Sequence, residues 1–432
     1  MNTQQSLTEK INTGAFDSTF GLIYNDTSAA RSRYNELLSL HTELFGAKEG
    51  LSLFSAPGRT EIGGNHTDHQ RGRVLAASVN LDVIAAVSKN DDNIVRIKSV
   101  GYPIDEINLD CLLPVEHEKE HAASLIRGVC AKVKELGYKI GGFDAYTTSN
   151  VLKGSGLSSS AAFEVLIGTI LSHLFNDGAL SPVLIAQIGQ YAENVFFGKP
   201  SGLMDQTASS VGGFVTIDFK DTQNPKIEKV DFDFDKAGHA LCIVDTGGNH
   251  ADLTNEYAAI TYEMRSAAEA FGGTVLRDIE DIDIIKNIPK LRETCSDRAI
   301  LRAFHSIEDS KRVLKQVKAL KENNFDCFKN LILESGHSSF EYLQNIYPAS
   351  NTAQQNVSVA LAVSQSVLAG KGAWRVHGGG FGGTIQAFVP NELLDTYKST
   401  IEQAIGEGCC HVLSIRPLGG IKLQADPARN SR

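Results

Sequence analysis

The segment VLKGSGLSSSAAFEVL, from Val151 to Leu166, places glycines and three consecutive serines in front of an apolar stretch. This order predicts a strand, a glycine loop and the start of a helix. Glycines permit a tight turn and let the backbone approach a ligand closely. The first N–H groups of a helix are unpaired, and the positive end of the helix dipole favours phosphate. The segment therefore predicts a loop that holds a polyphosphate.

The predicted nucleotide loop consists of Gly154, Ser155, Gly156, Leu157, Ser158, Ser159 and Ser160. It differs from the common phosphate loop because the Gly-Lys-Ser/Thr ending is absent. A Gly/Ser linker, or a helix with an ordinary serine cap, has a similar composition. The loop taken alone is compatible with either interpretation, so other segments have to decide between them.

Two such segments are SAPGRTEIGGNHTDHQRGRVLAASVN at residues 55–80 and RVHGGGFGGTIQAFVP at residues 375–390. Together with the loop, and in this order, they resemble the three signature motifs of the GHMP family of small-molecule kinases. That family includes galactokinase, homoserine kinase, mevalonate kinase and phosphomevalonate kinase. The first segment resembles the galactokinase branch, whose pattern runs Gly-Arg-x-Asn-x-Ile-Gly-Glu-His-Thr-Asp-Tyr. The resemblance covers the chain from about Arg33 to its C-terminus.

The resemblance implies a two-domain α+β fold, GHMP-kinase-like, with the active site in the cleft between the domains. It also implies an enzyme that uses ATP as cosubstrate, with Mg²⁺, to phosphorylate a hexose at its anomeric C1 hydroxyl. Galactose is the leading substrate, and galacturonic acid is the alternative.

Phosphoryl transfer to a hydroxyl requires a group that handles the hydroxyl proton and cations that face the developing charge. Asp205, in GKPSGLMDQ, is a lone acid in a weakly charged segment, where an aspartate is usually a helix cap. The resemblance makes it the catalytic aspartate, through the family segment Gly-x-Met-Asp-Gln, and implies that Arg59 lies beside it. Such an arginine depresses the pKa of a carboxyl, so Asp205 is expected to orient the hydroxyl rather than abstract its proton fully.

The resemblance assigns the metal site to Ser160 and Glu193. Mg²⁺ prefers oxygen ligands and keeps several waters, so one hydroxyl and one carboxylate suffice beside two phosphates. Without the resemblance, Glu193 in YAENVFFGK would be an exposed helical residue, and Ser160 would pack at the start of its helix.

Asn65, His66, Thr67 and Asp68 resemble the sugar-reading tetrad of galactokinases, in which Asp68 would accept hydrogen bonds from sugar hydroxyls. Tyr257, in LTNEYAAI, falls where the family has a sugar-contacting tyrosine. A tyrosine on an amphipathic helix is otherwise a packing residue.

The first motif also departs from the galactokinase pattern. Glu61 and Asn65 stand where the pattern has asparagine and glutamate, and His69 stands where it has tyrosine. In galactokinases the glutamate accepts from the O6 hydroxyl of the sugar. An asparagine is neutral and would tolerate a 6-carboxylate, and the plant galacturonic acid kinases also lack the glutamate. The group on the sixth carbon of the substrate is therefore left open by the sequence.

Two rival functions follow from the same resemblance. A yeast galactose sensor is similar to galactokinase but lacks a Ser-Ala pair in the second motif, whereas the run from Ser158 to Ala162 is complete here. A mevalonate or homoserine kinase shares the superfamily, but the His66-Thr67-Asp68 signature favours a sugar kinase. The sequence therefore predicts an active sugar kinase.

Composition also argues against several other classes of protein. The net charge of −10 over 432 residues, without a dense Lys/Arg run, argues against a nucleic-acid partner. Seven cysteines without a CxxC pair indicate neither a zinc site nor a disulfide framework. No signal peptide and no apolar run of about 18–20 residues is apparent. We expect a cytoplasmic monomer whose partners are the sugar and ATP.

Periodicity and turn residues predict the elements that carry these motifs. A composition change near Thr222 predicts an N-terminal domain at 1–222 and a C-terminal domain at 223–432. Residues 1–30 show little periodicity, so no element is predicted there. Helices are expected at 31–46, 122–136, 160–174, 182–197, 255–271, 298–322 and 352–368. Strands are expected at 51–59, 74–89, 93–99, 141–152, 213–219, 239–246, 383–390 and 411–418.

Overall fold

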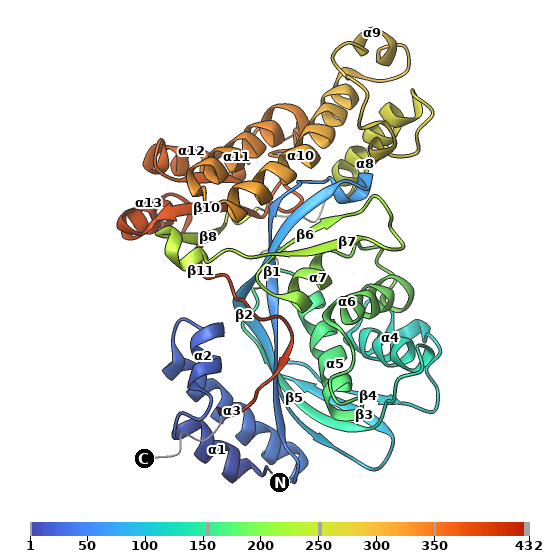
Figure 1. Cartoon of the computed structure of the whole chain (residues 1–432), viewed down its shortest axis with the longest axis vertical. Helices are drawn as coiled ribbons and strands as arrows, with labels where there is room; N and C mark the ends of the chain where they lie inside the picture. Colours follow the sequence, from blue (N-terminus) through green and yellow to red (C-terminus); the bar gives the residue numbers. More distant parts are fainter. Residues whose placement is uncertain (1, 153–155, 249–252, 350, 427–432) are drawn as a thin grey trace.

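The computed structural model describes residues 2–152, 156–248, 253–349 and 351–426. Within these residues the chain forms an eight-stranded sheet and a four-stranded sheet, each covered by helices (Figure 1). In Figure 1 most of the larger sheet lies below the smaller sheet, and its longest strands reach up beside it. The predicted α+β class is confirmed.

The larger sheet has the strand order β12-β1-β2-β5-β3-β4, and β6 joins β2 to β7. All of its pairings are antiparallel except that between β3 and β5. Its strands are β1 (Ser52–Gly63), β2 (Arg73–Lys89), β3 (Ile94–Ser99), β4 (Ile104–Asn108), β5 (Phe143–Ser149), β6 (Phe214–Asp218), β7 (Lys226–Val230) and β12 (Ile421–Lys422). The register of β1 against β2 shifts between Pro57 and Arg59. Such an irregularity bends the strand and redirects its side chains next to Arg59, which lies within β1.

Helices cover both faces of this sheet (Figure 1). On one side lie α4 (Ala122–Glu135), α5 (Ser159–Phe175), α6 (Pro182–Tyr191) with its π-helical extension at Ala192–Phe197, and α7 (Met204–Val211). Because α5 packs against β1, β2, α4, α6 and α7, it is apolar on nearly every side. The sequence did not predict α7, the short helix that carries Asp205.

The opposite face is covered by α1 (Gln4–Asn12), α2 (Asp17–Ile23) and α3 (Thr27–Phe45). The sequence predicted α3 but neither of the two shorter helices. Their apolar side chains, Leu7, Ile11 and Phe20, are buried against α3 and the sheet. Two short helices separated by a turn give too few repeats for a periodic pattern to be recognised.

Beneath these helices lies a cluster that we call the Asp82 cluster. The Asp82 carboxylate accepts hydrogen bonds from Arg33 Nη1 at 2.5 Å and from Arg416 Nη1 at 3.1 Å. Ser55 Oγ and Tyr24 Oη each donate to Asp82 Oδ2 at 2.5 Å. The side chains of Asp82 and Arg416 are wholly buried. The cluster therefore ties α3, β1, β2 and the C-terminal segment together in the interior.

The smaller sheet has the order β11-β8-β10-β9, with all strands antiparallel. Its strands are β8 (His239–Asp245), β9 (Ala373–His377), β10 (Thr384–Pro390) and β11 (Cys410–Leu413). The helices of this half are α8 (Thr254–Glu269), α9 (Ile288–Leu291), α10 (Asp297–Lys321), α11 (Phe325–Ser338), α12 (Asn356–Leu368) and α13 (Leu394–Ile405). The 25-residue α10 contacts both β1 and β2, so it joins the two halves of the molecule.

The larger sheet takes strands from both sides of residue 222. β7 begins at Lys226 and pairs with β6, and β12 near the C-terminus pairs with β1. The segment from Cys410 to Lys422 therefore runs from the smaller sheet back to the larger one (Figure 1).

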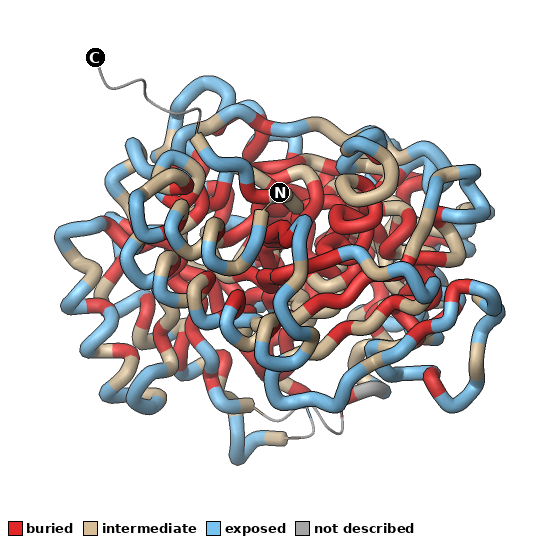
Figure 2. Tube along the Cα trace, turned by 90° about the horizontal axis from the view of Figure 1, so that it is seen from below, coloured by how far each residue is buried: buried red, intermediate tan, exposed pale blue. Residues whose placement is uncertain are grey.

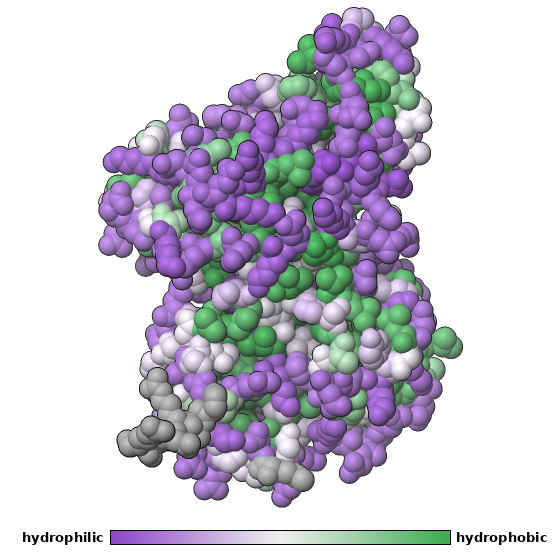
Figure 3. All heavy atoms as spheres, in the orientation of Figure 1, coloured by the Kyte–Doolittle hydropathy of each residue, from purple (hydrophilic) through white to green (hydrophobic). Residues whose placement is uncertain are grey.

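Buried segments occupy the centre of the molecule and exposed segments form its rim (Figure 2). The face in Figure 3 is mostly hydrophilic in its upper half, and apolar residues gather near the waist. Among the residues that the structure describes, no helix combines the length and apolarity needed to cross a membrane.

Candidate active site

Arg59 and Asp205 form a doubly hydrogen-bonded ion pair. Arg59 Nε lies 2.7 Å from Asp205 Oδ1, and Nη2 lies 2.6 Å from Oδ2. Ser158 Oγ donates to the same Oδ2 at 2.8 Å. Burial alone would raise the pKa of Asp205, but the charge and hydrogen bonds of Arg59, with Ser158, outweigh it and hold the pKa below its usual value. The Asp205 side chain keeps 27% of its surface exposed, so the ionised carboxylate is within reach of a ligand.

The described part of the nucleotide loop is anchored to Arg59. The Leu157 carbonyl accepts from the Arg59 backbone N–H at 2.9 Å, and the Gly156 carbonyl accepts from the Arg59 guanidinium. Leu157 is buried, and α5 begins at Ser159, one residue before the predicted start. Gly154 and Ser155 lie outside the described residues. The predicted order of strand, loop and helix is confirmed by β5 and α5.

Ser160 and Glu193, the predicted metal ligands, lie together. Ser160 Oγ is 3.3 Å from Glu193 Oε1, and Lys199 Nζ is 3.1 Å from the same oxygen. Glu193 is 3% exposed, not the exposed helical residue that its sequence context alone suggests. Its place in the π-helical turn after α6 directs the carboxylate toward the start of α5. Ser160 and Glu193 offer two oxygen ligands, and the Lys199 ammonium already lies against the carboxylate oxygen.

Two further residues of this cluster were missed by the sequence analysis. Gln206 Nε2 donates to Glu193 Oε2 at 2.8 Å and to Glu164 Oε2 at 3.0 Å. Burial raises the pKa of Glu164 well above its ordinary value, and the charge of Glu193 adds to the shift. Burial therefore favours the protonated form of Glu164 more than it would in an exposed glutamate. Glu164 could have been noticed as the only acid in the otherwise apolar α5.

The predicted sugar-reading residues separate into two groups. Only Asp68 of these described residues points its carboxylate toward the residues that lead into Asp205. Its Oδ2 lies 3.2 Å from the position that a Cβ would occupy on Gly202, three residues before Asp205. Its nearest described ionic partner is His69 Nε2, at 3.7 Å from Oδ1. An 18% exposed carboxylate in this position can accept hydrogen bonds from a polyol.

Asn65, His66 and Thr67 instead bond to protein groups. The Asn65 side chain is wholly buried, and its Nδ2 donates to the Gly378 carbonyl at 2.7 Å. His66 Nε2 lies 2.9 Å from the Gly379 carbonyl oxygen. Thr67 Oγ1 donates to the Gly64 carbonyl at 2.8 Å and closes the turn that follows β1.

Tyr257 contacts the third glycine loop, which we define as Gly378–Gly383. Its hydroxyl donates to the Gly380 carbonyl at 2.9 Å, and its ring packs edge-on against Phe381. Burial raises the pKa of Tyr257, so the phenol stays protonated and remains a donor. The third glycine loop in turn lies beside the nucleotide loop, because a Cβ on Gly156 would stand 3.3 Å from the His377 ring.

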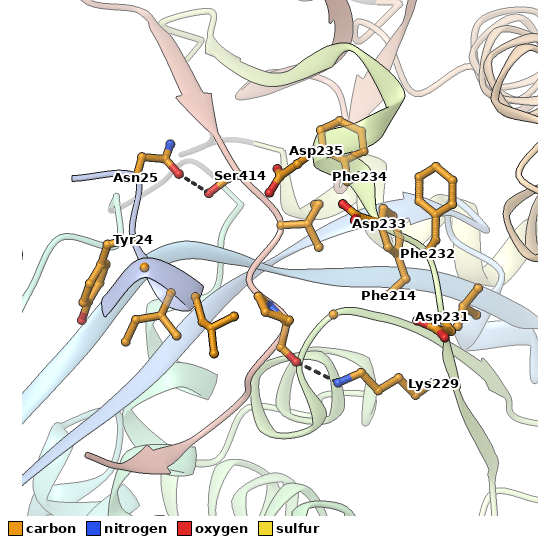
Figure 4. A pocket seen from close by; sticks show the side chains of 17 residues that line it. Tyr24, Asn25, Phe214, Lys229, Asp231, Phe232, Asp233, Phe234, Asp235 and Ser414 are labelled. Carbon is orange, nitrogen blue, oxygen red and sulfur yellow. Dashed lines mark hydrogen bonds between the residues drawn. The ribbon is translucent and has the colours of Figure 1, made fainter. Parts of the chain in front are cut away.

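A separate cavity of about 370 Å³ lies between α2, β7 and the segment after β11 (Figure 4). Asp231, Asp233 and Asp235 line it together with Lys229, whose Nζ donates to the Pro417 carbonyl at 2.7 Å. Three carboxylates at its wall would repel a polyphosphate. None of the described predicted site residues lines this cavity, so we do not assign the nucleotide to it.

Comparison with known proteins places the motifs in a family. Residues 124–213 match the model of the GHMP kinases N terminal domain, and residues 39–89 match the galactokinase galactose-binding signature. The galactokinase of Actinobacillus pleuropneumoniae serotype 3 is 31% identical over 362 residues, which are 83% of this chain and 90% of that protein. The galactokinase of Streptomyces coelicolor is also 31% identical over 362 residues, covering 84% of this chain and 90% of that protein.

Solved structures give the same fold. Lactococcus lactis galactokinase complexed with galactose has a TM-score of 0.75 at 23% identity, over 90% of this chain and 100% of that one. Methanococcus jannaschii mevalonate kinase has a TM-score of 0.58 at 14% identity, over 85% of this chain and 99% of that one. The protein is a GHMP kinase. Within that superfamily the chain belongs to the galactokinase family.

Proposed function

We propose that this chain transfers the γ-phosphoryl group of ATP to the C1 hydroxyl of galactose. The observation that carries the proposal is the ionised Asp205, which is doubly bonded to Arg59 and accepts from Ser158 of the nucleotide loop. The segment that leads to Asp205 faces the Asp68 carboxylate at Gly202. The galactose-binding signature at residues 39–89 and the galactokinase relatives support galactose as the sugar.

Asp205 orients the attacking hydroxyl in this proposal. Its depressed pKa makes it a weak base, so it accepts a hydrogen bond from the sugar O–H and takes the proton only as the O–P bond forms. The loose transition state of phosphoryl transfer requires little proton removal before that point. Arg59 holds the carboxylate in place and faces the charge that develops on the transferred group.

The phosphates are assigned to the start of α5, where Ser159 and Ser160 present hydroxyls and backbone N–H groups. The residues present fit a magnesium ion. The Ser160 hydroxyl and the buried Glu193 carboxylate are hard oxygen ligands, and the Lys199 ammonium already rests against Glu193 Oε1. When bound, Mg²⁺ would neutralise phosphate charge there, and Gln206 would hold the Glu193 carboxylate through its second oxygen.

The proposal is tested by coupled ADP release with galactose, galacturonate, glucuronate, N-acetylgalactosamine and mevalonate as acceptors. Galactose is expected to give the highest kcat/KM, and the phosphate is expected on C1 of the product. A preference for galacturonate would retain the kinase assignment and replace the sugar. If the protein bound galactose but turned over ATP with none of these acceptors, the result would instead support a silent sensor.

A further inference from the structure

Asn65 is held by the C-terminal half of the molecule through both its backbone and its side chain. Its N–H donates to Asp309 Oδ2 at 2.9 Å, and its carbonyl oxygen lies 3.0 Å from His305 Nε2. Its Oδ1 accepts from Asn345 Nδ2 at 2.9 Å and from Ser339 Oγ at 3.3 Å. With Nδ2 bonded as well, every polar group of Asn65 is used by protein.

Glu61 joins Asn65 to a buried arginine. Asn65 Nδ2 donates to Glu61 Oε1 at 3.0 Å, and Arg375 Nη2 lies 2.5 Å from the same oxygen. Arg375 is wholly buried, and its Nη1 donates to the Ile62 carbonyl at 2.8 Å. A buried guanidinium needs a countercharge, so the carboxylate at position 61 is required where it stands.

The same residues fix the third glycine loop. The Gly378 carbonyl accepts from Asn65, the Gly379 carbonyl from His66 and Asn345, and the Gly380 carbonyl from Tyr257. A side chain at Gly380 would collide with Asn345, because its Cβ would lie 2.0 Å from the Asn345 carbonyl oxygen. His66 itself adopts a φ of 58°, an uncommon value outside glycine, and its bond to Gly379 holds it there.

We propose that Glu61, Asn65 and Arg375 form a latch that joins the turn carrying Asp68 to the third glycine loop, and that Asn65 is a positioning residue which does not contact the sugar. The inference rests on the proposed function, since Asp68 is the sugar-binding group that the latch positions. The proposal assigns the carbohydrate contacts of this segment to Asp68 and none to Asn65.

The latch also accounts for the departure of the first motif from the galactokinase pattern. The pattern has an amide at position 61 and a carboxylate at position 65, and this chain has the reverse. One carboxylate and one amide are present in both arrangements, and in this chain the carboxylate is the one that faces Arg375. The two substitutions are therefore expected to be coupled, with each one harmful unless the other accompanies it.

The test is a double-mutant cycle with nearly isosteric changes. N65D places a second carboxylate beside Glu61 in a buried site, and E61Q/N65D restores a single negative charge. N65D is expected to raise KM for galactose at least about tenfold while KM for ATP stays within about twofold. E61Q/N65D is expected to regain at least about tenfold in kcat/KM over N65D. Melting temperatures of all variants are measured in parallel.

A matched control is E118Q/N65D. Glu118 is another buried carboxylate paired with an arginine, Arg127, through bonds of 2.7 and 2.6 Å, but it lies outside the latch. This variant is expected to show no recovery over N65D. The inference is overturned if N65D keeps the wild-type KM for galactose, if the losses of E61Q and N65D simply multiply, or if E118Q rescues equally. Should the wild type phosphorylate no sugar, the proposed function fails, and the melting temperatures still report whether positions 61 and 65 are coupled.

Discussion

Two aspartates of this molecule, Asp205 and Asp82, have the same kinds of hydrogen-bond partner but differ in their exposure to solvent. Asp205 is bonded to Arg59 and Ser158, whereas Asp82 is bonded to Arg33, Arg416 and Ser55. In both cases burial would raise the pKa of the carboxyl and arginine charge lowers it below the usual value.

Exposure and charge balance separate the two clusters. Asp205 keeps 27% of its side chain exposed and has one arginine, whereas Asp82 is completely buried between two. Two tyrosines, Tyr24 and Tyr34, close the Asp82 cluster from the side of α1–α3. An ionised aspartate paired with arginine can therefore stabilise the fold when it is fully buried, and can take part in chemistry when a substrate can reach it. The variants below test that distinction.

The largest effect is expected for D205N. It keeps the shape of the side chain but removes the negative charge that orients the hydroxyl, so kcat should fall about 10²–10⁴-fold. ATP binding should stay close to wild type, and the melting temperature should fall less than in D82N, because the Asp205 side chain is partly exposed whereas that of Asp82 is not. The measurement is steady-state turnover with a parallel nucleotide titration. A kcat near that of the wild type would remove Asp205 from the mechanism.

D82N should show the reverse pattern. Removing one partner of a buried ion pair leaves uncompensated charge, here on Arg33 and Arg416, and costs about 3–5 kcal/mol. We expect urea unfolding to show this loss, while turnover per folded molecule changes less than about threefold. If D82N abolished turnover without loss of stability, the two clusters would not differ in the way proposed.

E193Q and E164Q compare two buried glutamates that share the Gln206 amide. Glu193 is assigned to the metal, so E193Q should raise the Mg²⁺ concentration for half-maximal rate at least about tenfold. Burial raises the pKa of Glu164 and no metal role is assigned to it, so E164Q should change the metal dependence much less than E193Q does. Titrating Mg²⁺ at saturating ATP and galactose measures both. Equal responses of the two variants would show that the cation is held elsewhere.

The smallest effect concerns pH. The depressed pKa of Asp82 means that its contribution to stability is present above the ordinary aspartate pKa, about 3.9, and is lost as pH falls through the lower folded value. The stability advantage of wild type over D82N should therefore be constant from pH 7 to about 5 and smaller near pH 3. An advantage that grew on acidification would contradict the assigned direction of the shift.

The sequence was most informative where chemistry resides in short contiguous motifs. Arg59 and Asp205 were predicted through the resemblance of their short segments to family motifs, and Ser158 through the glycine-serine loop. The structure brings the three into one hydrogen-bonded cluster. The strand, loop and helix order around the nucleotide loop was predictable for the same reason. The Asp82 cluster was not predictable, because Arg33 and Arg416 are 49 and 334 residues away from Asp82 and carry no local signature.

The sugar-reading segment shows a different limit. Four adjacent residues, Asn65 to Asp68, were predicted together, but the direction of each side chain depends on the left-handed φ of His66 and on bonds to α10 and the third glycine loop. The sequence also suggested that glutamate at position 65 would distinguish galactose from galacturonate. With Glu61 Oε1 only 3.0 Å from Asn65 Nδ2, a carboxylate there would instead be repelled whatever the sugar.

The central claim is that the partly exposed Asp205 performs the chemistry and the fully buried Asp82 does not. The most direct measurement is galactose-dependent ADP release by wild type, D205N and D82N at equal concentrations of folded protein, with the product examined by ³¹P NMR. The account predicts galactose 1-phosphate from wild type and D82N at similar rates, and at least about 10²-fold slower formation by D205N. Comparable rates for D205N and wild type, or loss of turnover in folded D82N alone, would contradict it.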